Sequence, residues 1–117
     1  KYHAAASILS NQVIAVLDMG YSLLEDCGFT RAEAVRATGQ LVMRNIENVL
    51  EAGCDGALTG PIERNDIETV KKHIACMQND DSDDVRLYKM LGTKLVNIAE
   101  KKNPDKDYTQ MMELLRG

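Results

Sequence analysis

The sequence has no tryptophan, one phenylalanine and two prolines, Pro61 and Pro104, among its 117 residues. It also lacks any stretch of strict apolar and polar alternation, which is the pattern of a half-buried β-strand. Because its glycines punctuate segments of helical periodicity, the chain predicts an all-α fold. A single domain of this length buries roughly two thirds of its surface on folding and needs neither a metal nor a disulfide to fold.

An excess of basic charge is missing as well. The chain has 14 Lys and Arg against 18 Asp and Glu, a net charge of −4, which argues against binding to a nucleic-acid backbone. The three cysteines, Cys27, Cys54 and Cys76, are odd in number and form no C-x-x-C pair. We therefore expect reduced thiols in the cytoplasm, with no disulfide framework and no metal site. Cys27 and Cys54 adjoin glycines at helix ends, which predicts a packing role for them.

A long uninterrupted apolar run is also absent, since the longest covers residues 13–17. A membrane span needs about 20 predominantly apolar residues, so none is expected. The first residues carry no signal-peptide pattern, no initiator methionine and no capping residue, although they are already helical in pattern. This start is the one expected of a domain excised from a longer protein.

About five helices are predicted, with two long ones at the centre, over 1–27, 30–52, 67–77, 84–102 and 103–116. Gly28 suits the left-handed residue that ends the first helix. Thr30 and Glu33 form a capping box for the second, which should stop at Gly53. Asp66, with Asn65, is expected to cap the third helix.

The acidic run 79–84 favours the positive N-terminus of the fourth helix and does not fit a calcium loop. Asn103 is expected to cap the last helix, with Pro104 at its first position.

The centre of the first helix, residues 13–17, is apolar on all sides and must be covered on all sides. A second copy of the chain or a missing domain would supply the cover, so we expect a homodimer formed through the long helices. A central helix in a monomeric bundle is the alternative.

Three polar residues, His3, Ser7 and Asn11, follow one another at intervals of four on the first helix. A solvated face normally uses Lys, Glu and Arg, yet none of these occurs between Tyr2 and Asp18. Small hydrogen-bonding residues inside an apolar helix favour a cleft or a buried polar network. Histidine suits proton transfer near neutral pH, and serine and asparagine suit the orientation of a carbonyl or carboxylate. A solvated face remains the alternative.

The second candidate region is the glycine-rich connection over residues 53–62, which contains three glycines and Pro61. Glycines let the backbone approach a ligand closely, and Thr59 is expected to cap a short turn that begins at Pro61. Arg64 and Asp66 follow this connection. The alternative is an ordinary helix connection. No phosphate-binding glycine motif is present, and His73 is expected at a partly exposed helical position.

Several segments taken together resemble a known family: Tyr-His-Ala-Ala-Ala at 2–6, Ser-Asn at 10–11, Ala-Leu-Thr-Gly-Pro-Ile-Glu-Arg-Asn-Asp at 57–66, Thr69, His73, and Leu-Tyr-Lys-Met-Leu-Gly at 87–92. They are similar to a helical domain of unassigned function that follows a Rossmann-like NADP-binding domain in a group of bacterial oxidoreductases. Those proteins resemble pyrroline-5-carboxylate reductase and, more distantly, 6-phosphogluconate and hydroxyacid dehydrogenases. The resemblance covers residues 1–102, and Asn65 stands where the family often has glycine.

The resemblance implies a dimeric fold like the C-terminal domain of 6-phosphogluconate dehydrogenase. This chain, 1–117, would be the substrate-binding and dimerisation half of an NAD(P)-dependent oxidoreductase. The Rossmann-like domain that binds most of the NADP or NAD would precede it. Hydride would pass to or from a C=O or C=N group of a small-molecule substrate, and the isolated half would be inactive.

Hydroxyacid dehydrogenases carry Lys and Asn four residues apart on the first long helix of this domain, but no lysine stands on the comparable face here. His3 is therefore the expected proton donor or relay, with Ser7 and Asn11 orienting the substrate. Thr59, the Gly60 backbone and Arg64 are expected on the opposite wall, where they would hold a carboxylate. A non-enzymatic helical interaction module is the competing hypothesis.

Overall fold

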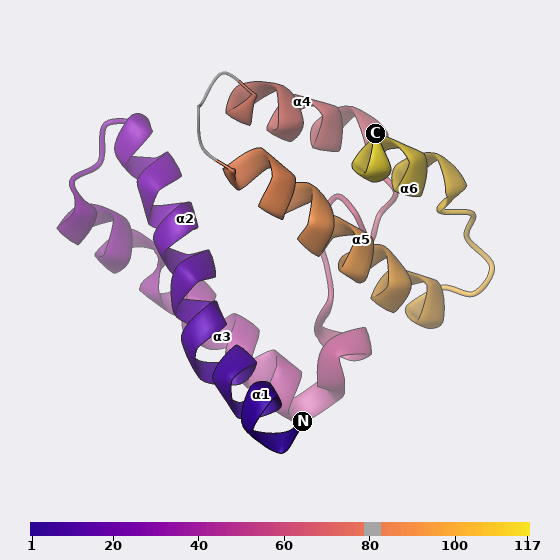
Figure 1. The fold of residues 1–117 in the computed structure, drawn as a ribbon, viewed down its shortest axis with the longest axis horizontal. Coiled ribbons are helices and arrows are strands. Elements are labelled where there is room, and N and C mark those ends of the chain that lie inside the picture. Colours follow the sequence, from indigo (N-terminus) through magenta and orange to yellow (C-terminus); the bar gives the residue numbers. More distant parts are fainter. Residues whose placement is uncertain (79–82) are drawn as a thin grey trace. The chain divides into compact units, whose positions relative to one another are not determined.

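The structure is a computed structural model that describes residues 1–78 and 83–117, and all regular structure in these residues is helical. The elements are α1 (Tyr2–Ser7), η1 (Ile8–Gln12), α2 (Val13–Asp26), α3 (Arg31–Ala57), α4 (Ile67–Met77), α5 (Asp84–Lys102) and α6 (Thr109–Arg116). Figure 1 shows α1, η1 and α2 as one continuous helix, so the described part of the chain has five helices. The predicted all-α class is confirmed. The chain divides into unit 1, Lys1–Arg44, and unit 2, Asn45–Gly117, with α3 contributing to both.

The turn between α2 and α3 in unit 1 follows the predicted capping rules. Gly28 has a φ of 102°, and its amide and that of Phe29 donate to the carbonyls of Glu25 and Leu24, which is a Schellman motif. The Thr30 hydroxyl accepts from the Glu33 amide at 3.1 Å, while the Glu33 carboxylate accepts from the Thr30 amide at 3.0 Å. These two hydrogen bonds lower the pKa of Glu33. The capping box is confirmed.

Unit 1 has almost no interior, because Ala34 is its only buried residue. The contacts between α2 and α3 include the guanidinium of Arg31, which lies 2.9 Å from the Asp18 carboxylate and also pairs with Glu25. Arg31 further donates to Ser22. These polar contacts gather around the turn. Several apolar side chains of the two helices are largely exposed, among them Leu9, Ile14 and Leu41.

The continuous helix Tyr2–Asp26 has the length and composition of a membrane-crossing helix, and none of its most apolar stretch is buried. The exclusion of a span from the lack of an uninterrupted apolar run was therefore too strict, since isolated polar residues such as Ser10 do not disqualify a helix. Length and composition alone do not separate a membrane span from a helix that another protein surface covers.

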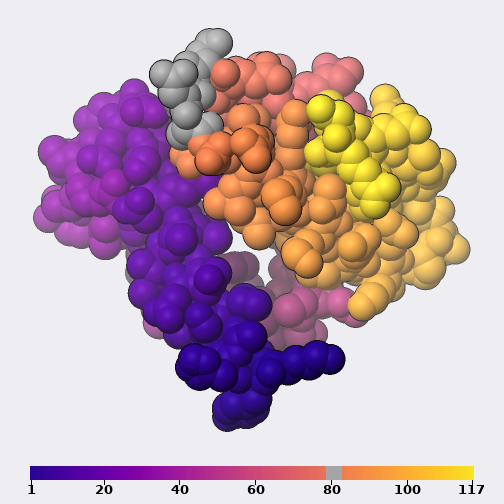
Figure 2. All heavy atoms as spheres, in the orientation of Figure 1, coloured from indigo at the N-terminus to yellow at the C-terminus, as the bar shows by residue number. Residues whose placement is uncertain are grey.

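Unit 2 holds the hydrophobic core, where α4, α5 and α6 pack on one another (Figure 1). Its buried members come from all three helices and from two flanking loops, and they are Ile62, Val70, Ile74, Val96, Ala99, Tyr108, Met111 and Leu115. A Cβ added to the buried Gly92 would lie 2.8 Å from Cδ2 of Leu115, so glycine permits the close approach of α5 to α6. Figure 2 shows α6 on the surface of this unit beside α5.

Several predicted helix ends are confirmed and two need correction. The Asp66 carboxylate accepts from the Thr69 amide and caps α4, and α5 runs over Asp84–Lys102 as predicted. Residues 79–82 of the acidic run that was expected to favour the N-terminus of α5 lie outside the described residues. Gly53 breaks α3 with φ 77° and ψ 173°, but helical structure resumes and continues to Ala57.

The last helix begins at Thr109, five residues after Pro104, its predicted first position. Asn103 does not cap it, because Asn103 ends α5 and its amide is held by the Glu63 carboxylate at 3.1 Å and the Tyr108 hydroxyl at 3.0 Å. Pro104 therefore lies in the connecting turn. Tyr108 is at the N-cap position of α6, and the preceding Asp107 carboxylate accepts from the Thr109 amide at 2.9 Å.

Candidate functional site

The first set of predicted site residues lies on the continuous helix of unit 1. Ser7 is half-buried, whereas His3 and Asn11 are exposed. Asn11 belongs to η1, a π-helical segment over Ile8–Gln12, rather than to regular α-helix. Short π-helical segments inside α-helices are often found at functional sites.

The π segment changes which side chains are neighbours. In a π-helix, residues five positions apart are hydrogen-bonded neighbours. Accordingly, the Ser7 hydroxyl donates to Oε1 of Gln12 at 3.5 Å. The Ser10 hydroxyl instead donates back to the Ala6 carbonyl at 2.7 Å. A wheel at 100° per residue pairs Ser7 with Asn11, so sequence reasoning missed Gln12. Periodicity carries no signal that would have revealed the extra residue in this turn.

Two further residues of the same continuous helix, Asp18 and Tyr21, have a structural role at the turn to α3. Asp18 pairs with Arg31 across the turn, and the Tyr21 ring lies 5.6 Å below the same guanidinium. A cation over an aromatic face and an ion pair both stabilise the α2–α3 corner. Because Asp18 and Tyr21 both contact Arg31, we do not include them with the candidate site residues His3, Ser7 and Asn11.

The glycine-rich connection in unit 2 has the fixed geometry that was expected. Gly60 has a φ of 99° and Asn65 a φ of 61°, both in the left-handed region. The turn that begins at Pro61 is closed by hydrogen bonds from the Arg64 amide to the Gly60 carbonyl and from the Asp66 amide to the Pro61 carbonyl. The Gly60 carbonyl, rather than the predicted Thr59 hydroxyl, begins this turn. Thr59 and Arg64 are exposed, and Gly60 is half-buried.

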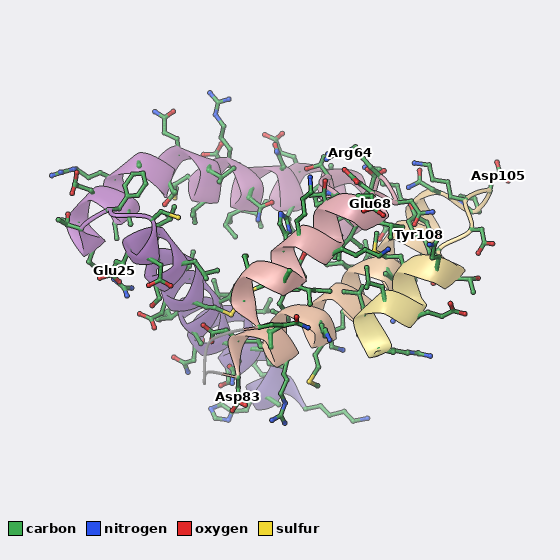
Figure 3. All side chains as sticks on the ribbon, turned by 90° about the horizontal axis from the view of Figure 1, so that it is seen from above. Glu25, Arg64, Glu68, Asp83, Asp105 and Tyr108 are labelled. Carbon is green, nitrogen blue, oxygen red and sulfur yellow. The ribbon has the colours of Figure 1, made fainter. Side chains whose placement is uncertain are left out.

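A polar network anchors this connection to the end of α5 and the start of α6. The Lys102 ammonium donates to the Leu58 carbonyl at 2.6 Å. The buried Tyr108 hydroxyl donates to the Glu63 carbonyl at 2.6 Å, and the Asn65 amide donates to the carbonyl that precedes Tyr108 at 2.7 Å. Figure 3 shows Arg64 and Tyr108 towards the same end of unit 2. The sequence carried no signal for these contacts, because their partners lie about 40 residues apart along the chain.

Unit 2 contains a small cavity of about 220 Å³ beside Thr59. It is lined by the end of α3, the following loop and α5, through Asn45, Val49, Cys54, Ala57, Leu58, Thr59, Leu95 and Ile98. Thr59 is the one predicted site residue in this lining. Gly60 and Arg64 are its neighbours in the chain but do not contribute to the wall.

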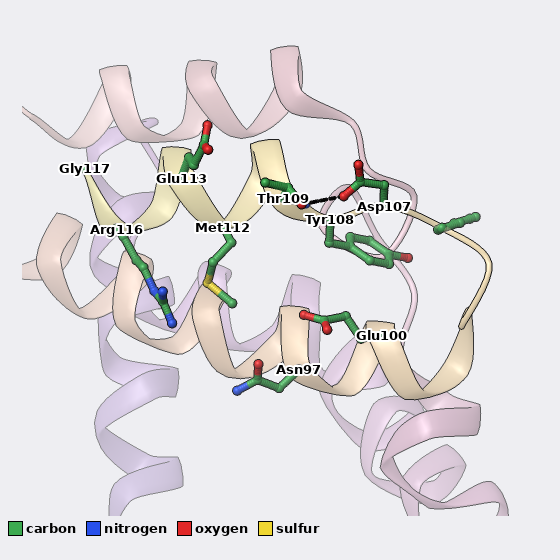
Figure 4. A pocket seen from close by; sticks show the side chains of 10 residues that line it. Asn97, Glu100, Asp107, Tyr108, Thr109, Met112, Glu113, Arg116 and Gly117 are labelled. Atoms are coloured by element: carbon green, nitrogen blue, oxygen red, sulfur yellow. Dashed lines mark hydrogen bonds between the residues drawn. The ribbon is translucent and has the colours of Figure 1, made fainter.

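A larger cavity of about 800 Å³ lies between α5 and α6 (Figure 4). Charged side chains surround it, namely Glu100, Lys106, Asp107, Glu113 and Arg116. Hydrogen bonds from the side chain and amide of Thr109 lower the pKa of Asp107. None of the predicted site residues lines this cavity.

Other reactive side chains lie away from both candidate sets. Nδ1 of His73 and the Tyr88 hydroxyl are 2.9 Å apart, and burial, with the nearby Cys76, raises the pKa of Tyr88. His73 is half-buried, as predicted. The three cysteines are free, but all are exposed, so the packing role predicted for Cys27 and Cys54 is wrong. Residues 1–78 and 83–117 contain no group of His, Cys, Asp and Glu that could hold a metal ion.

The predicted site residues are divided between the two units. Unit 1 contains His3, Ser7 and Asn11. Unit 2 contains Thr59, Gly60 and Arg64. That the two sets face one substrate stays a prediction.

Comparison with known proteins gives one family. The family model described as "Domain of unknown function (DUF2520)" matches residues 1–95, which include all six predicted site residues. No curated protein and no solved structure matches the chain. The match ends within α5, so the remainder of α5, the turn and α6 lie beyond it.

Proposed function

Because the chain belongs to the family described as a domain of unknown function (DUF2520), we propose a function from its own residues and from the resemblance they carry. The chain is the substrate-binding and dimerisation domain of an NAD(P)-dependent oxidoreductase, which transfers hydride to or from a C=O or C=N group. It acts in the cytoplasm, where its exposed thiols stay reduced. The family match covers the segments that carry the resemblance, and its description gives no function.

The observation that carries the proposal is the uncovered apolar surface of unit 1. Leu9 and Ile14 on the first helix are 77% and 64% exposed, and Leu41 and Met43 on α3 are 71% and 60% exposed. Covering one such side chain contributes about 1.5–3 kcal/mol. A two-helix unit with one buried residue gains its stability from a partner surface, and a second copy of the same unit supplies it.

The chemistry proposed for the site divides between the two candidate sets. His3 donates or relays the proton, and Ser7 and Asn11 orient the reacting carbonyl or imine by hydrogen bonds. Thr59, the Gly60 backbone and the Arg64 guanidinium hold a carboxylate of the substrate.

The cofactor belongs to the partner domain in this proposal. A nicotinamide, when bound, supplies or accepts the hydride. This chain has no glycine-rich phosphate motif, so its residues do not fit the pyrophosphate, which a Rossmann-like domain would hold.

The catalytic assignment is tested with the full-length protein. NAD(P)H oxidation is measured over a panel of carbonyl and imine compounds, and His3→Ala and Thr59→Ala are then compared on a substrate so identified. Loss of a positioned proton donor lowers kcat by about 10²–10⁴-fold. His73→Gln is the matched histidine control and keeps turnover within about threefold. Wild-type turnover in both site variants refutes the site.

The dimer is tested separately on the 117-residue chain by light scattering at micromolar concentration. The wild type is expected at twice the chain mass. Leu9→Glu and Ile14→Glu each weaken pairing by at least about tenfold, because each places a charge in the covered surface. Gln40→Glu adds the same charge at an exposed polar position of α3 and leaves pairing unchanged. A wild-type monomer refutes the dimer.

A non-enzymatic helical interaction module is the second candidate. The exposure of His3 and Asn11 favours it, since such a module leaves its polar residues in solvent and binds another protein through its apolar faces. The coding region upstream decides between the two. A G-x-G-x-x-G segment after a predicted strand, with NAD(P)H binding by the full-length protein, supports the oxidoreductase, and absence of both supports the module.

A further inference from the structure

We propose that the 220 Å³ cavity beside Thr59 binds a small neutral carbonyl compound with an aliphatic body. This inference goes beyond the proposed function, because it assigns the cavity a neutral ligand of its own, separate from the substrate whose carboxylate Thr59, Gly60 and Arg64 are proposed to hold. Its geometry lies wholly within unit 2 and involves neither His3 nor the cofactor.

The size and lining of the cavity set the body of the ligand. Most lining side chains are aliphatic, with Val49 from α3, Leu58 from the loop and Ile98 from α5 on three sides. Liquid water occupies about 30 Å³ per molecule, so the cavity holds on the order of seven water-sized groups. A short branched carbon chain fills that space and buries apolar surface against these walls.

The polar residues of the lining set the other end of the ligand. Asn45 and Thr59 bring a carboxamide and a hydroxyl to the cavity, and both residues are exposed. Both are donors suited to a carbonyl oxygen. The free thiol of Cys54 lies in the same lining.

The lack of charge in the lining of this cavity favours a neutral ligand over a carboxylic acid. No charged side chain is among its lining residues. The ammonium of Lys102 is engaged by the Leu58 carbonyl at 2.6 Å, and Arg64 does not contribute to the wall. A carboxylate would find no ion-pair partner in the lining, whereas a ketone needs none.

The probe for the test is 4-methyl-2-pentanone, compared with the acid 4-methylpentanoate, on the 117-residue chain. Amide chemical shifts of Cys54, Leu58 and Thr59 are followed by two-dimensional NMR, and the ketone is expected to bind with a Kd on the order of 1 mM. Val49→Phe fills the cavity and abolishes the shifts. Leu50→Phe, at the adjacent position that is 81% exposed, leaves them unchanged. Thr59→Val weakens ketone binding about three- to tenfold, because it removes a hydrogen-bond donor without changing shape.

An independent readout is the alkylation rate of Cys54 by N-ethylmaleimide in a chain that carries Cys27→Ser and Cys76→Ser. Ketone at about three times its Kd should slow this rate about fourfold. Absence of shifts at about 10 mM ketone, shifts that survive Val49→Phe, or tighter binding of the acid would overturn the proposal. Failure of the full-length protein to bind NAD(P)H refutes the proposed function and leaves a positive cavity result in place.

Discussion

Removal of the Tyr108 hydroxyl tests the network that anchors the glycine-rich connection. In Tyr108→Phe the Glu63 carbonyl loses the donor that lies 2.6 Å away, and the Asn103 amide loses an acceptor at 3.0 Å. Asn103 keeps its second bond to the Glu63 carboxylate, so the unpaired carbonyl dominates the cost. Tyr108 is 3% exposed, and a buried acceptor left without a donor costs about 1–3 kcal/mol.

The assay is urea unfolding followed by circular dichroism at 222 nm. With a slope of about 1.5 kcal/mol per molar urea, the expected loss lowers the midpoint by about 0.7–2 M. Tyr2→Phe is the matched control, because Tyr2 is 91% exposed and its hydroxyl is solvated, so its shift stays within about 0.5 kcal/mol. Faster amide exchange over residues 58–66 should accompany the loss in Tyr108→Phe. If its midpoint shift is no larger than that of Tyr2→Phe, the network does not hold the connection in place.

Three further predictions concern stability. Gly53→Ala should lower the free energy of unfolding in urea by about 1–3 kcal/mol, because φ 77° with ψ 173° is a conformation that only glycine adopts readily. No atom lies within 4 Å of an added Cβ, so the cost comes from the backbone, and an unchanged midpoint contradicts this. Met111→Ala removes a fully buried side chain and should lower the free energy of unfolding by about 2–5 kcal/mol, and a loss under about 1 kcal/mol would place Met111 outside the core. Hydrogen bonds from the Thr69 side chain and amide lower the pKa of Asp66 from its ordinary value of 3.8. The ionised carboxylate therefore stabilises the fold above pH 3.8, and this stabilisation is lost as the pH falls through the lowered pKa of the folded state. The urea midpoint of Asp66→Asn should therefore lie below that of the wild type at pH 7 and approach it at about pH 2, and a gap that does not change with pH contradicts the assignment.

Local signals predicted much of the fold. The Gly28 turn, the Thr30–Glu33 box and the Asp66 cap all depend on residues within four or five positions of one another, and the structure shows each of them. The start of α6 was mispredicted because Asn103 is engaged by Glu63, 40 residues away, and is not available to cap a helix. A contact at that separation leaves no trace in a local pattern.

The candidate site was predicted less completely than the fold. Periodicity identified the polar residues of the first helix, but a constant 100° step hides the π segment that pairs Ser7 with Gln12. The glycine-rich connection was recognised from its composition. Its anchoring by Lys102 and Tyr108 and the cavity beside Thr59 depend on how α5 and α6 pack against it.

The sequence by itself determined the all-helical class, most helix boundaries and the apolar character of the first helix, because these follow from residue type and spacing over a few turns. Only the tertiary structure decided that unit 1 buries one residue while unit 2 holds the core, since burial depends on which helices meet. Tertiary structure also decided which polar groups surround Thr59. Packing brings together α3, a loop and α5, and a cavity exists only where side chains from such distant segments fail to fill the space between them.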